Sequence, residues 1–189
     1  MDSRENNSTD VKTQQVNVME KASPIRKTEW SKVDLIIRVL WGTIGRFVWL
    51  YIPFLRVSVL RMFGGRVGRD CSIARSVEIV IPWNITIGNS CDIREHVILY
   101  SLGEIKIGNH VCIDTRAHLC AGSHDMRDSS FSLTKPPITI GNNTLVGVDA
   151  FIGPGVELGD DVCVHPRSSV YKNFENGVEL QGNPARVIE

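Results

Sequence analysis

The sequence predicts an all-β fold, a parallel β-helix built from hexapeptide repeats and preceded by a helical segment. Aliphatic residues recur with a period of six over most of the region beyond Gly64. Glycine repeatedly follows the aliphatic residue, and a small or medium-sized residue stands four positions after most of them. A unit of one short strand and one turn cannot bury its apolar side chain alone, so successive units must wrap and stack. Three such units would complete one triangular coil.

The register of the repeat can be read from the sequence. It first runs in three groups, each offset by two residues from the last: Val67, Ile73 and Ile79; Ile87, Ile93 and Leu99; Ile107, Ile113 and Leu119. After a lapse it resumes strictly six apart at Ile140, Val146, Ile152, Leu158, Val164 and Val170. The second inward position holds Cys71, Val77, Cys91, Val97, Val111, Ala117, Thr144, Ala150, Val156, Val162 and Ser168. We expect the Gly, Asn and Asp residues that follow the aliphatic position to form the corners.

Composition and charge narrow the class of protein. A chain of 189 residues with 42% hydrophobic content has room for one compact domain plus appendages. Because 21 Lys and Arg balance 21 Asp and Glu, the net charge gives no reason to expect nucleic-acid binding. The five cysteines are irregularly spaced and include no C-x-x-C pair, which argues against a zinc or redox centre and favours a reducing cytoplasm.

Two segments precede the repeat. Residues 1–32 are polar, lack the pattern of a signal peptide, and are predicted to form a disordered tail. Residues 33–63 are apolar and predicted to be helical, with a bend or break at Pro53. Four arginines divide the segment into apolar runs of at most nine residues: Arg38, Arg46, Arg56 and Arg61. These runs are far shorter than the roughly 20 apolar residues that span a bilayer. Two interpretations stay open for 33–63, a helical cap packed on the main domain or an interfacial anchor at the cytoplasmic face of a membrane.

The lapse between Leu119 and Ile140 is where we expect a functional loop, at about residues 122–137 within the domain 64–189, which ends in a short C-terminal tail. The 21-residue interval from Leu119 to Ile140 accommodates three hexads with three extra residues, or fewer hexads and a larger excursion. Loops displayed by a rigid scaffold commonly carry sites. This one contains Gly122-Ser123-His124-Asp125, followed by Arg127, Phe131 and Lys135-Pro136-Pro137. His124 is the catalytic candidate.

Several motifs occur in an order that resembles a known family, the hexapeptide-repeat acetyltransferases. They are Phe63-Gly64-Gly65, Pro82-Trp83-Asn84 before Thr86-Ile87-Gly88, Leu99-Tyr100-Ser101-Leu102-Gly103, Leu119 to Asp125, Pro137-Ile138-Thr139-Ile140-Gly141, Pro154-Gly155-Val156 and Gly182-Asn183-Pro184-Ala185. The span from about Arg38 to the C-terminus resembles in particular the colanic acid biosynthesis acetyltransferases, which are related to the maltose and galactoside acetyltransferases.

This resemblance implies a left-handed β-helix, a homotrimer, and active sites in the clefts between subunits. It implies transfer of acetyl from acetyl-CoA to a hydroxyl of a saccharide acceptor in exopolysaccharide biosynthesis, with His124 as the general base. His96 falls where galactoside-type relatives place an acceptor-binding asparagine, and a surface corner histidine is an equal alternative. Asp125 or Asp114 could orient the imidazole, although sequence gives no geometry.

For acetyl-CoA, the resemblance points to the coils after the loop. Gly147, Val148, Pro166 and Arg167 would lie along the donor, and Lys172 and Arg186 would meet its nucleotide phosphates. A solvated position for Lys172 and Arg186 is the alternative. The sequence departs from the family's pattern at Leu145, where tryptophan is common, and at His165-Pro166-Arg167, where a small glycine-containing segment is usual.

Two other interpretations compete with acetyl transfer. A γ-type carbonic anhydrase uses the same scaffold and three histidines to hold zinc, but the six-residue spacing of His118 and His124 differs from the shorter offset of those sites, so we expect no metal. A catalytically silent scaffold is the other alternative, and the Ser123-His124-Asp125 loop argues against it. Thiol chemistry at Cys120 has no support from its sequence surroundings.

Overall fold

The computed structural model describes residues 30–125 and 132–188, so most of the predicted tail and the loop residues Arg127 and Phe131 lie outside the described residues. The chain divides into two compact units. The larger unit, Ser31–Ser123 with Lys135–Glu189, holds the helices and the repeat. The smaller unit includes His124–Thr134 and is described separately below.

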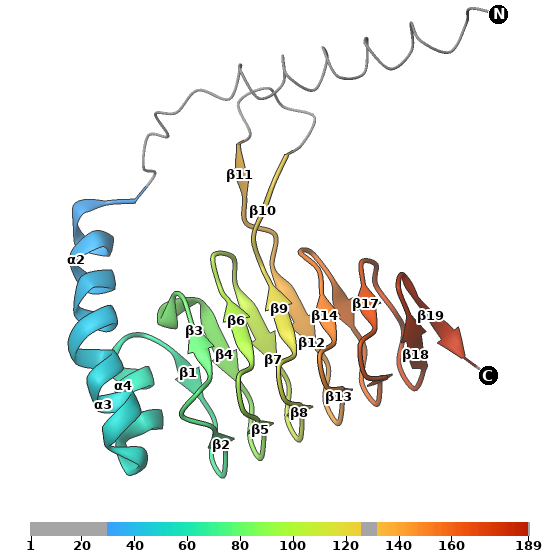
Figure 1. Ribbon diagram of the computed structural model, residues 1–189, viewed down its shortest axis with the longest axis horizontal. Coiled ribbons are helices and arrows are strands. Elements are labelled where there is room, and N and C mark those ends of the chain that lie inside the picture. The colour runs from blue at the N-terminus through green and yellow to red at the C-terminus, as the bar shows by residue number, and fades with distance from the viewer. Residues whose placement is uncertain (1–29, 126–131, 189) are drawn as a thin grey trace, which may run out of the picture. The chain divides into compact units, whose positions relative to one another are not determined.

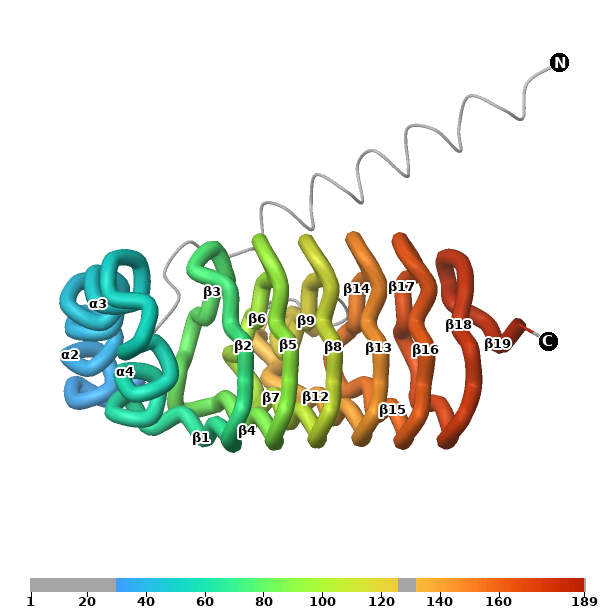
Figure 2. Tube along the Cα trace, turned by 90° about the horizontal axis from the view of Figure 1, so that it is seen from below, coloured from blue at the N-terminus to red at the C-terminus, as the bar shows by residue number. Residues whose placement is uncertain are grey.

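The repeat forms a parallel β-helix with three sheets (Figures 1 and 2). Sheet A contains β1 (Arg66–Val67), β4 (Ile85–Ile87), β7 (Ile105–Ile107), β12 (Ile138–Ile140) and β15 (Glu157–Leu158). Sheet B contains β2 (Ser72–Ile73), β5 (Asp92–Ile93), β8 (Cys112–Ile113), β13 (Leu145–Val146), β16 (Cys163–Val164), β18 (Glu179–Gly182) and the antiparallel β19 (Ala185–Ile188). Sheet C contains β3 (Glu78–Ile79), β6 (Ile98–Tyr100), β9 (His118–Cys120), β14 (Phe151–Ile152) and β17 (Ser169–Val170).

The predicted register is confirmed. Equivalent aliphatic residues of successive coils pair in parallel, as in Val67 with Ile87 and Ile73 with Ile93. The aliphatic positions are all buried, and so is the second inward position in every coil except at Cys71, which is half-buried in the first coil. One continuous hydrophobic core therefore runs the length of the β-helix.

The corner between sheets A and B is held by a column of polar side chains. Asn109 Nδ2 donates to Asn142 Oδ1 at 3.0 Å, and Asn142 Nδ2 donates to Asp160 Oδ1 at 3.1 Å. The same oxygens accept the backbone N–H groups of Asn109 and Asn142 at 2.8 and 2.6 Å. Each side-chain oxygen thus accepts hydrogen bonds from the turn of the preceding coil. This role explains the Asn and Asp residues that follow glycine in the repeat.

A set of short helices covers the first coil (Figure 2). They are α2 (Lys32–Leu40), the π-helical turn η1 (Trp41–Gly45), α3 (Arg46–Tyr51), the 3₁₀ turn η2 (Pro53–Leu55) and α4 (Arg56–Met62); a further 3₁₀ turn, η3 (Pro82–Asn84), lies in the coil itself. The Trp41 and Trp49 indoles donate to the carbonyls of Ile79 and Arg75, both at 3.0 Å. Together with the buried side chains of Val59 and Leu60, these contacts close the end of the core.

The helical segment is broken where the sequence predicts. α3 ends at Tyr51 and a 3₁₀ turn begins at Pro53, so Arg56 and Arg61 lie on a different helix from Arg38 and Arg46. Within the described chain, the helices are too short and too interrupted by charge for any of them to cross a membrane.

Candidate active site

The corner between sheets B and C gathers most of the candidate acceptor and donor residues. This corner consists of the turns from β2 to β3, β5 to β6, β8 to β9, β13 to β14 and β16 to β17. Six candidates lie in these turns: His96, Asp114, Gly147, Val148, Pro166 and Arg167. The structure therefore brings into one edge residues that are up to 71 positions apart in the sequence.

Successive turns of the B/C corner stack through their backbones. The Arg116 N–H donates to the Glu95 carbonyl, Asp149 N–H to Thr115 and Arg167 N–H to Val148, at 2.8 to 3.0 Å. His96, Arg116, Asp149 and Arg167 all adopt positive φ, between 56° and 61°. His96 and Arg167 consequently occupy the same column of the corner, three coils apart.

Ion pairs connect three side chains of this column, Arg116, Asp149 and Arg167. Arg116 Nε and Nη2 donate to the two Asp149 oxygens at 2.7 and 3.0 Å, and Arg167 Nε lies 3.6 Å from Asp149 Oδ2. Hydrogen bonding to Arg116 lowers the pKa of the Asp149 carboxyl. Arg167 therefore already has an acidic partner at the corner.

Asp114 and Gly147 occupy another column of the same corner. Asp114 accepts the Thr115 N–H at 2.7 Å and lies 3.2 Å from Arg94 Nη1, and the backbone hydrogen bond from Thr115 is the main cause of the lowered pKa of Asp114. At Gly147 a Cβ atom would lie 2.7 Å from the Val164 carbonyl oxygen. Only glycine fits here without a shift of the next coil.

The other two donor candidates, Lys172 and Arg186, line one pocket at the C-terminal end of the β-helix. The pocket has a volume of about 530 Å³ and is also lined by Tyr171, Phe174, Pro184, Ala185 and Val187. Lys172 Nζ lies 5.1 Å from the centre of the Phe174 ring, a cation–π distance. Two cations and two aromatic rings in one open pocket suit a ligand that carries both phosphates and a flat ring.

The loop leaves the coil at the corner between sheets C and A. The Gly103 N–H donates to the Ala121 carbonyl at 2.6 Å, and a Cβ atom at Gly103 would lie 2.6 Å from the Lys135 carbonyl oxygen. The chain departs after Gly122 and re-enters sheet A at Ile138. Of the two arrangements that the 21-residue interval allows, the structure has the larger excursion without additional hexads.

The excursion begins and ends as a two-stranded sheet of β10 (Ser123–His124) and β11 (Leu133–Thr134). The Asp125 N–H donates to the Ser132 carbonyl at 3.0 Å, and the His124 side chain is half-buried. The six-residue spacing of His118 and His124 matches one repeat, but the chain has already left the coil at His124, so the two histidines do not occupy equivalent positions of the repeat.

Comparisons with known proteins identify the family of this chain. Residues 137–172 match the family model described as bacterial transferase hexapeptide, six repeats. Over 153 residues the chain is 39% identical to a protein of Escherichia coli (strain K12) named "Putative colanic acid biosynthesis acetyltransferase WcaF", covering 79% of this chain and 84% of that protein. The chain belongs to the hexapeptide-repeat acetyltransferases.

Other members of the hexapeptide-repeat acetyltransferases are similar over much of the chain. Galactoside O-acetyltransferase of Escherichia coli (strain K12) is 28% identical over 163 residues, covering 85% of this chain and 70% of that protein. An acetyltransferase from Vibrio cholerae O1 biovar eltor, solved with acetyl coenzyme A, has a TM-score of 0.79 at 21% identity and covers 91% of this chain and 97% of its own. Galactoside acetyltransferase solved with coenzyme A has a TM-score of 0.76 at 24% identity, covering 86% and 84%. The two solved structures show the fold.

Most of the predicted residues of this acetyltransferase separate onto two edges of sheet C, whereas Arg186 lies on β19 of sheet B. The B/C corner carries His96, Asp114 and the set from Gly147 to Arg167, whereas the C/A corner carries the root of the His124 loop. Lys172 follows β17 and so also lies on the C/A side. Neither the pocket beside the helices nor the pocket at the C-terminal end contains residues of both sets.

Sequence reasoning missed a row of aromatic side chains on the outer face of sheet C. Ring centres are 6.3 Å apart for Tyr100 and His118, 5.5 Å for His118 and Phe151, and 5.7 Å for Phe151 and Tyr171. Among the described residues, His118 Nε2 is buried without a hydrogen-bond partner, and burial lowers the pKa of this imidazole. The signal was present in the residues next to Leu99, Leu119, Ile152 and Val170, whose side chains must face outward when the aliphatic ones face inward.

The metal and thiol alternatives concern the surroundings of the histidines and cysteines. Across residues 30–125 and 132–188, no three His, Cys, Asp or Glu side chains are grouped as metal ligands would be. Burial raises the thiol pKa values of Cys91, Cys112 and Cys163, which disfavours the thiolate. Cys120 Sγ donates to the Gly122 carbonyl at 3.2 Å, a structural contact at the base of the loop.

Proposed function

We propose that this acetyltransferase moves an acetyl group from acetyl-CoA to a hydroxyl of a sugar or saccharide intermediate in exopolysaccharide biosynthesis. The observation that carries the proposal is the pocket that brings together Lys172 and Arg186, in a chain 39% identical to an acetyltransferase named for colanic acid biosynthesis. Lys172 and Arg186 would hold the phosphates of the donor, and Tyr171 or Phe174 would stack on its adenine.

The proposed chemistry is direct transfer with His124 as general base. A neutral imidazole nitrogen takes the proton from the acceptor hydroxyl as that oxygen attacks the thioester carbonyl carbon. The tetrahedral oxyanion collapses, the C–S bond breaks, and the thiolate of CoA takes the proton from the imidazolium. The products are an O-acetyl ester and free CoA thiol, without an enzyme-bound acetyl group.

We further propose that each active site is completed by a neighbouring copy in a homotrimer. The loop root and Lys172 lie on one edge of sheet C, and the six candidates in the turns of the B/C corner lie on the opposite edge. In a cyclic assembly, each subunit contacts the next through two different surfaces, so the C/A corner of one copy can face the B/C corner of its neighbour. This arrangement would place His124 of one copy beside His96 and Gly147 of the next.

The catalytic proposal is tested by release of CoA thiol from acetyl-CoA with a panel of nucleotide-linked and lipid-linked sugars. Acceptor-dependent release should fall by about 10² to 10⁴-fold in His124→Ala, the range expected for loss of a general base. Equal release by wild type and variant would move the base to another residue. Binding of acetyl-CoA without release for any acceptor would favour the silent scaffold.

The assembly proposal is tested by mixing two inactive variants. His124→Ala removes the base from the loop, and Val148→Arg blocks the half-buried corner position. If each site takes its loop from one copy and its corner from the next, each mixed trimer contains one intact site, and random mixing restores about a quarter of wild-type activity. If both parts come from the same copy, mixing restores none.

A further inference from the structure

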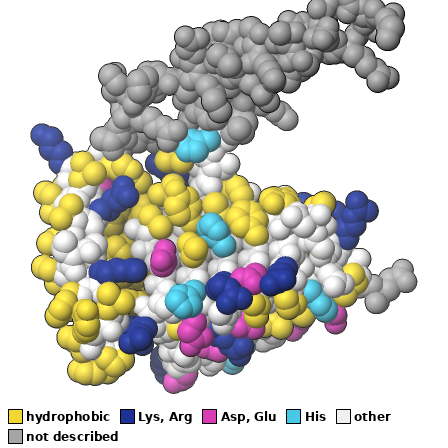
Figure 3. Space-filling model, in the orientation of Figure 1, with side chains coloured by type: hydrophobic (Ala, Val, Ile, Leu, Met, Phe, Trp, Pro, Cys, Tyr) yellow, Lys and Arg dark blue, Asp and Glu magenta, His cyan; other side chains and the backbone are white. Residues whose placement is uncertain are grey.

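The helices that close the first coil present a second, exposed apolar face. Of the fourteen exposed large hydrophobic residues in the described chain, eleven lie between Val33 and Met62. Figure 3 shows hydrophobic side chains gathered over this end of the β-helix, with Lys and Arg among them. An exposed apolar surface of this kind on a soluble fold usually marks a docking site.

Part of this face is a continuous stripe along α2, η1 and α3. Its members, here called the apolar stripe, are Val33, Ile36, Leu40, Ile44, Phe47 and Tyr51, with exposed fractions of 63, 60, 41, 59, 60 and 71%. They are spaced by three or four residues, as on one face of a helix. The opposite face is already used, because Trp41, Gly45 and Trp49 are buried against the first coil.

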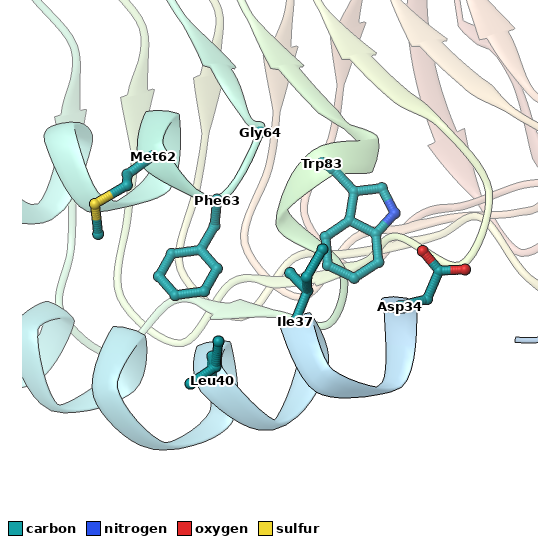
Figure 4. A pocket seen from close by; sticks show the side chains of 7 residues that line it. All are labelled: Asp34, Ile37, Leu40, Met62, Phe63, Gly64 and Trp83. Carbon is teal, nitrogen blue, oxygen red and sulfur yellow. The ribbon is translucent and has the colours of Figure 1, made fainter. Parts of the chain in front are cut away.

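A shallow pocket extends the apolar surface beside the stripe. It has a volume of about 450 Å³ and is lined by Asp34, Ile37, Leu40, Met62, Phe63, Gly64 and Trp83. Figure 4 shows Ile37 pointing toward the Trp83 indole and Leu40 toward the Phe63 ring. Leu40 belongs to both the stripe and the pocket, and Met62 at its rim is 74% exposed. The pocket therefore gives the docking face depth as well as area.

The charge on this segment identifies its occupant. Residues 30–63 contain five cations, Lys32, Arg38, Arg46, Arg56 and Arg61, against one acid, Asp34, in a chain whose net charge is zero. Arg56 and Arg61 donate to the carbonyls of Trp49 and Val67, contacts that orient the guanidinium groups without neutralising them. A second copy would bring the same five cations and would be repelled. An apolar stripe with cations and aromatic residues matches a helix lying in an anionic lipid interface.

We propose that the helical segment 32–62 docks this protein on the surface of an anionic lipid bilayer. The apolar stripe enters the boundary between headgroups and acyl chains, and the arginines and Lys32 pair with lipid phosphates. The helices lie in the plane of the surface, and the buried indoles of Trp41 and Trp49 attach the β-helix to them. This inference does not depend on the acetyl-transfer proposal.

The test is flotation of the full chain with vesicles of phosphatidylcholine alone or with about 30% phosphatidylglycerol. Wild-type protein should float with the anionic vesicles, and raising the salt from about 0.1 to 1 M should weaken binding because the charges become screened. Replacing two members of the apolar stripe, in the double variant Phe47→Ser/Tyr51→Ser, should weaken binding by about tenfold or more. Lys32→Gln should weaken it about fivefold, the effect of one cation near an anionic surface.

Matched variants separate docking from loss of fold. Leu145→Ser removes an exposed apolar side chain from sheet B, and Lys106→Gln removes an exposed cation from sheet A; both should float like wild type. Phe54 is 81% exposed on the same helical segment, so Phe54→Ser should also weaken flotation with the anionic vesicles. Wild-type protein left in the soluble fraction with anionic vesicles, or stripe variants that float normally, would overturn the proposal. If the stripe variant lost the oligomeric state of the wild-type protein, the apolar stripe would be a self-association surface. This result would also overturn the docking proposal.

Discussion

Removing the two cations of the C-terminal pocket should raise KM for acetyl-CoA. The cause would be the loss of contacts to the phosphates of its nucleotide, with no effect on the thioester or the pantetheine arm. Lys172 and Arg186 are both exposed and line the same pocket, so the proposed contacts with the donor phosphates would be made next to water. At that exposure, an ion pair or charged hydrogen bond changes affinity by about 1.4- to 5-fold. Because both cations would act on the same ligand, Lys172→Gln/Arg186→Gln should raise KM for acetyl-CoA by about 2- to 25-fold at low salt.

S-acetylpantetheine provides the discriminating assay for this pair. It carries the same thioester and pantetheine arm but lacks the phosphorylated nucleotide, so the double variant should use it as well as wild type does. The difference in KM for acetyl-CoA should shrink as salt is raised. Lys106→Gln, which removes an exposed lysine of sheet A, is the matched control and should leave KM unchanged. An equal loss with both donors would show that the two cations act on structure or on the acceptor.

Three further outcomes follow from the structure. Cys120→Ala should leave acetyl transfer within about twofold of wild type, since direct transfer needs no thiol, and near-complete loss would reject that mechanism. Asn142→Ala should lower the free energy of unfolding, measured by urea denaturation, by about 2 kcal/mol, because it removes two accepted and one donated side-chain hydrogen bond. An unchanged midpoint of the urea transition would contradict the structural role of the A/B corner. His118→Phe should lose less stability than wild type between pH 8 and pH 5, and parallel losses in the two proteins would contradict the buried state of this imidazole.

The sign of the His118 effect follows from its burial. The pKa of the folded imidazole is lowered from its ordinary value of 6.5. As the pH falls below 6.5, the unfolded chain binds a proton that the folded chain resists, so wild type loses stability until the pH reaches the lowered pKa. Phenylalanine keeps the ring contacts with Tyr100 and Phe151 and does not titrate.

The coil could be predicted because its determinants are local and periodic. Every sixth residue from Ile140 to Val170 is aliphatic, and that spacing alone fixes which side chains face the core. The break at Pro53 was likewise predictable from the backbone restriction of proline. His124 could be placed in a loop because the repeat lapses around it.

The grouping of the site residues could not be predicted in the same way. His96 and Arg167 are 71 residues apart, and they share a column only because three coils of particular length lie between them. Sequence could propose Lys172 and Arg186 as partners of one ligand, but their shared pocket depends on the return of β19 along β18. The aromatic row of sheet C has no motif of its own and becomes visible only when the coils are stacked.

The sequence by itself determined the period, the inward positions and therefore the three-sided coil, because a repeating unit that cannot bury its own apolar residue has to stack on its neighbours. Only the tertiary structure decided how the charged and aromatic residues meet. It placed two groups of candidate residues on opposite edges of sheet C, and it used one face of the helical segment to close the core while leaving the other exposed. These arrangements depend on which residues the coil length and the helix packing bring together, and this long-range geometry is absent from the local pattern.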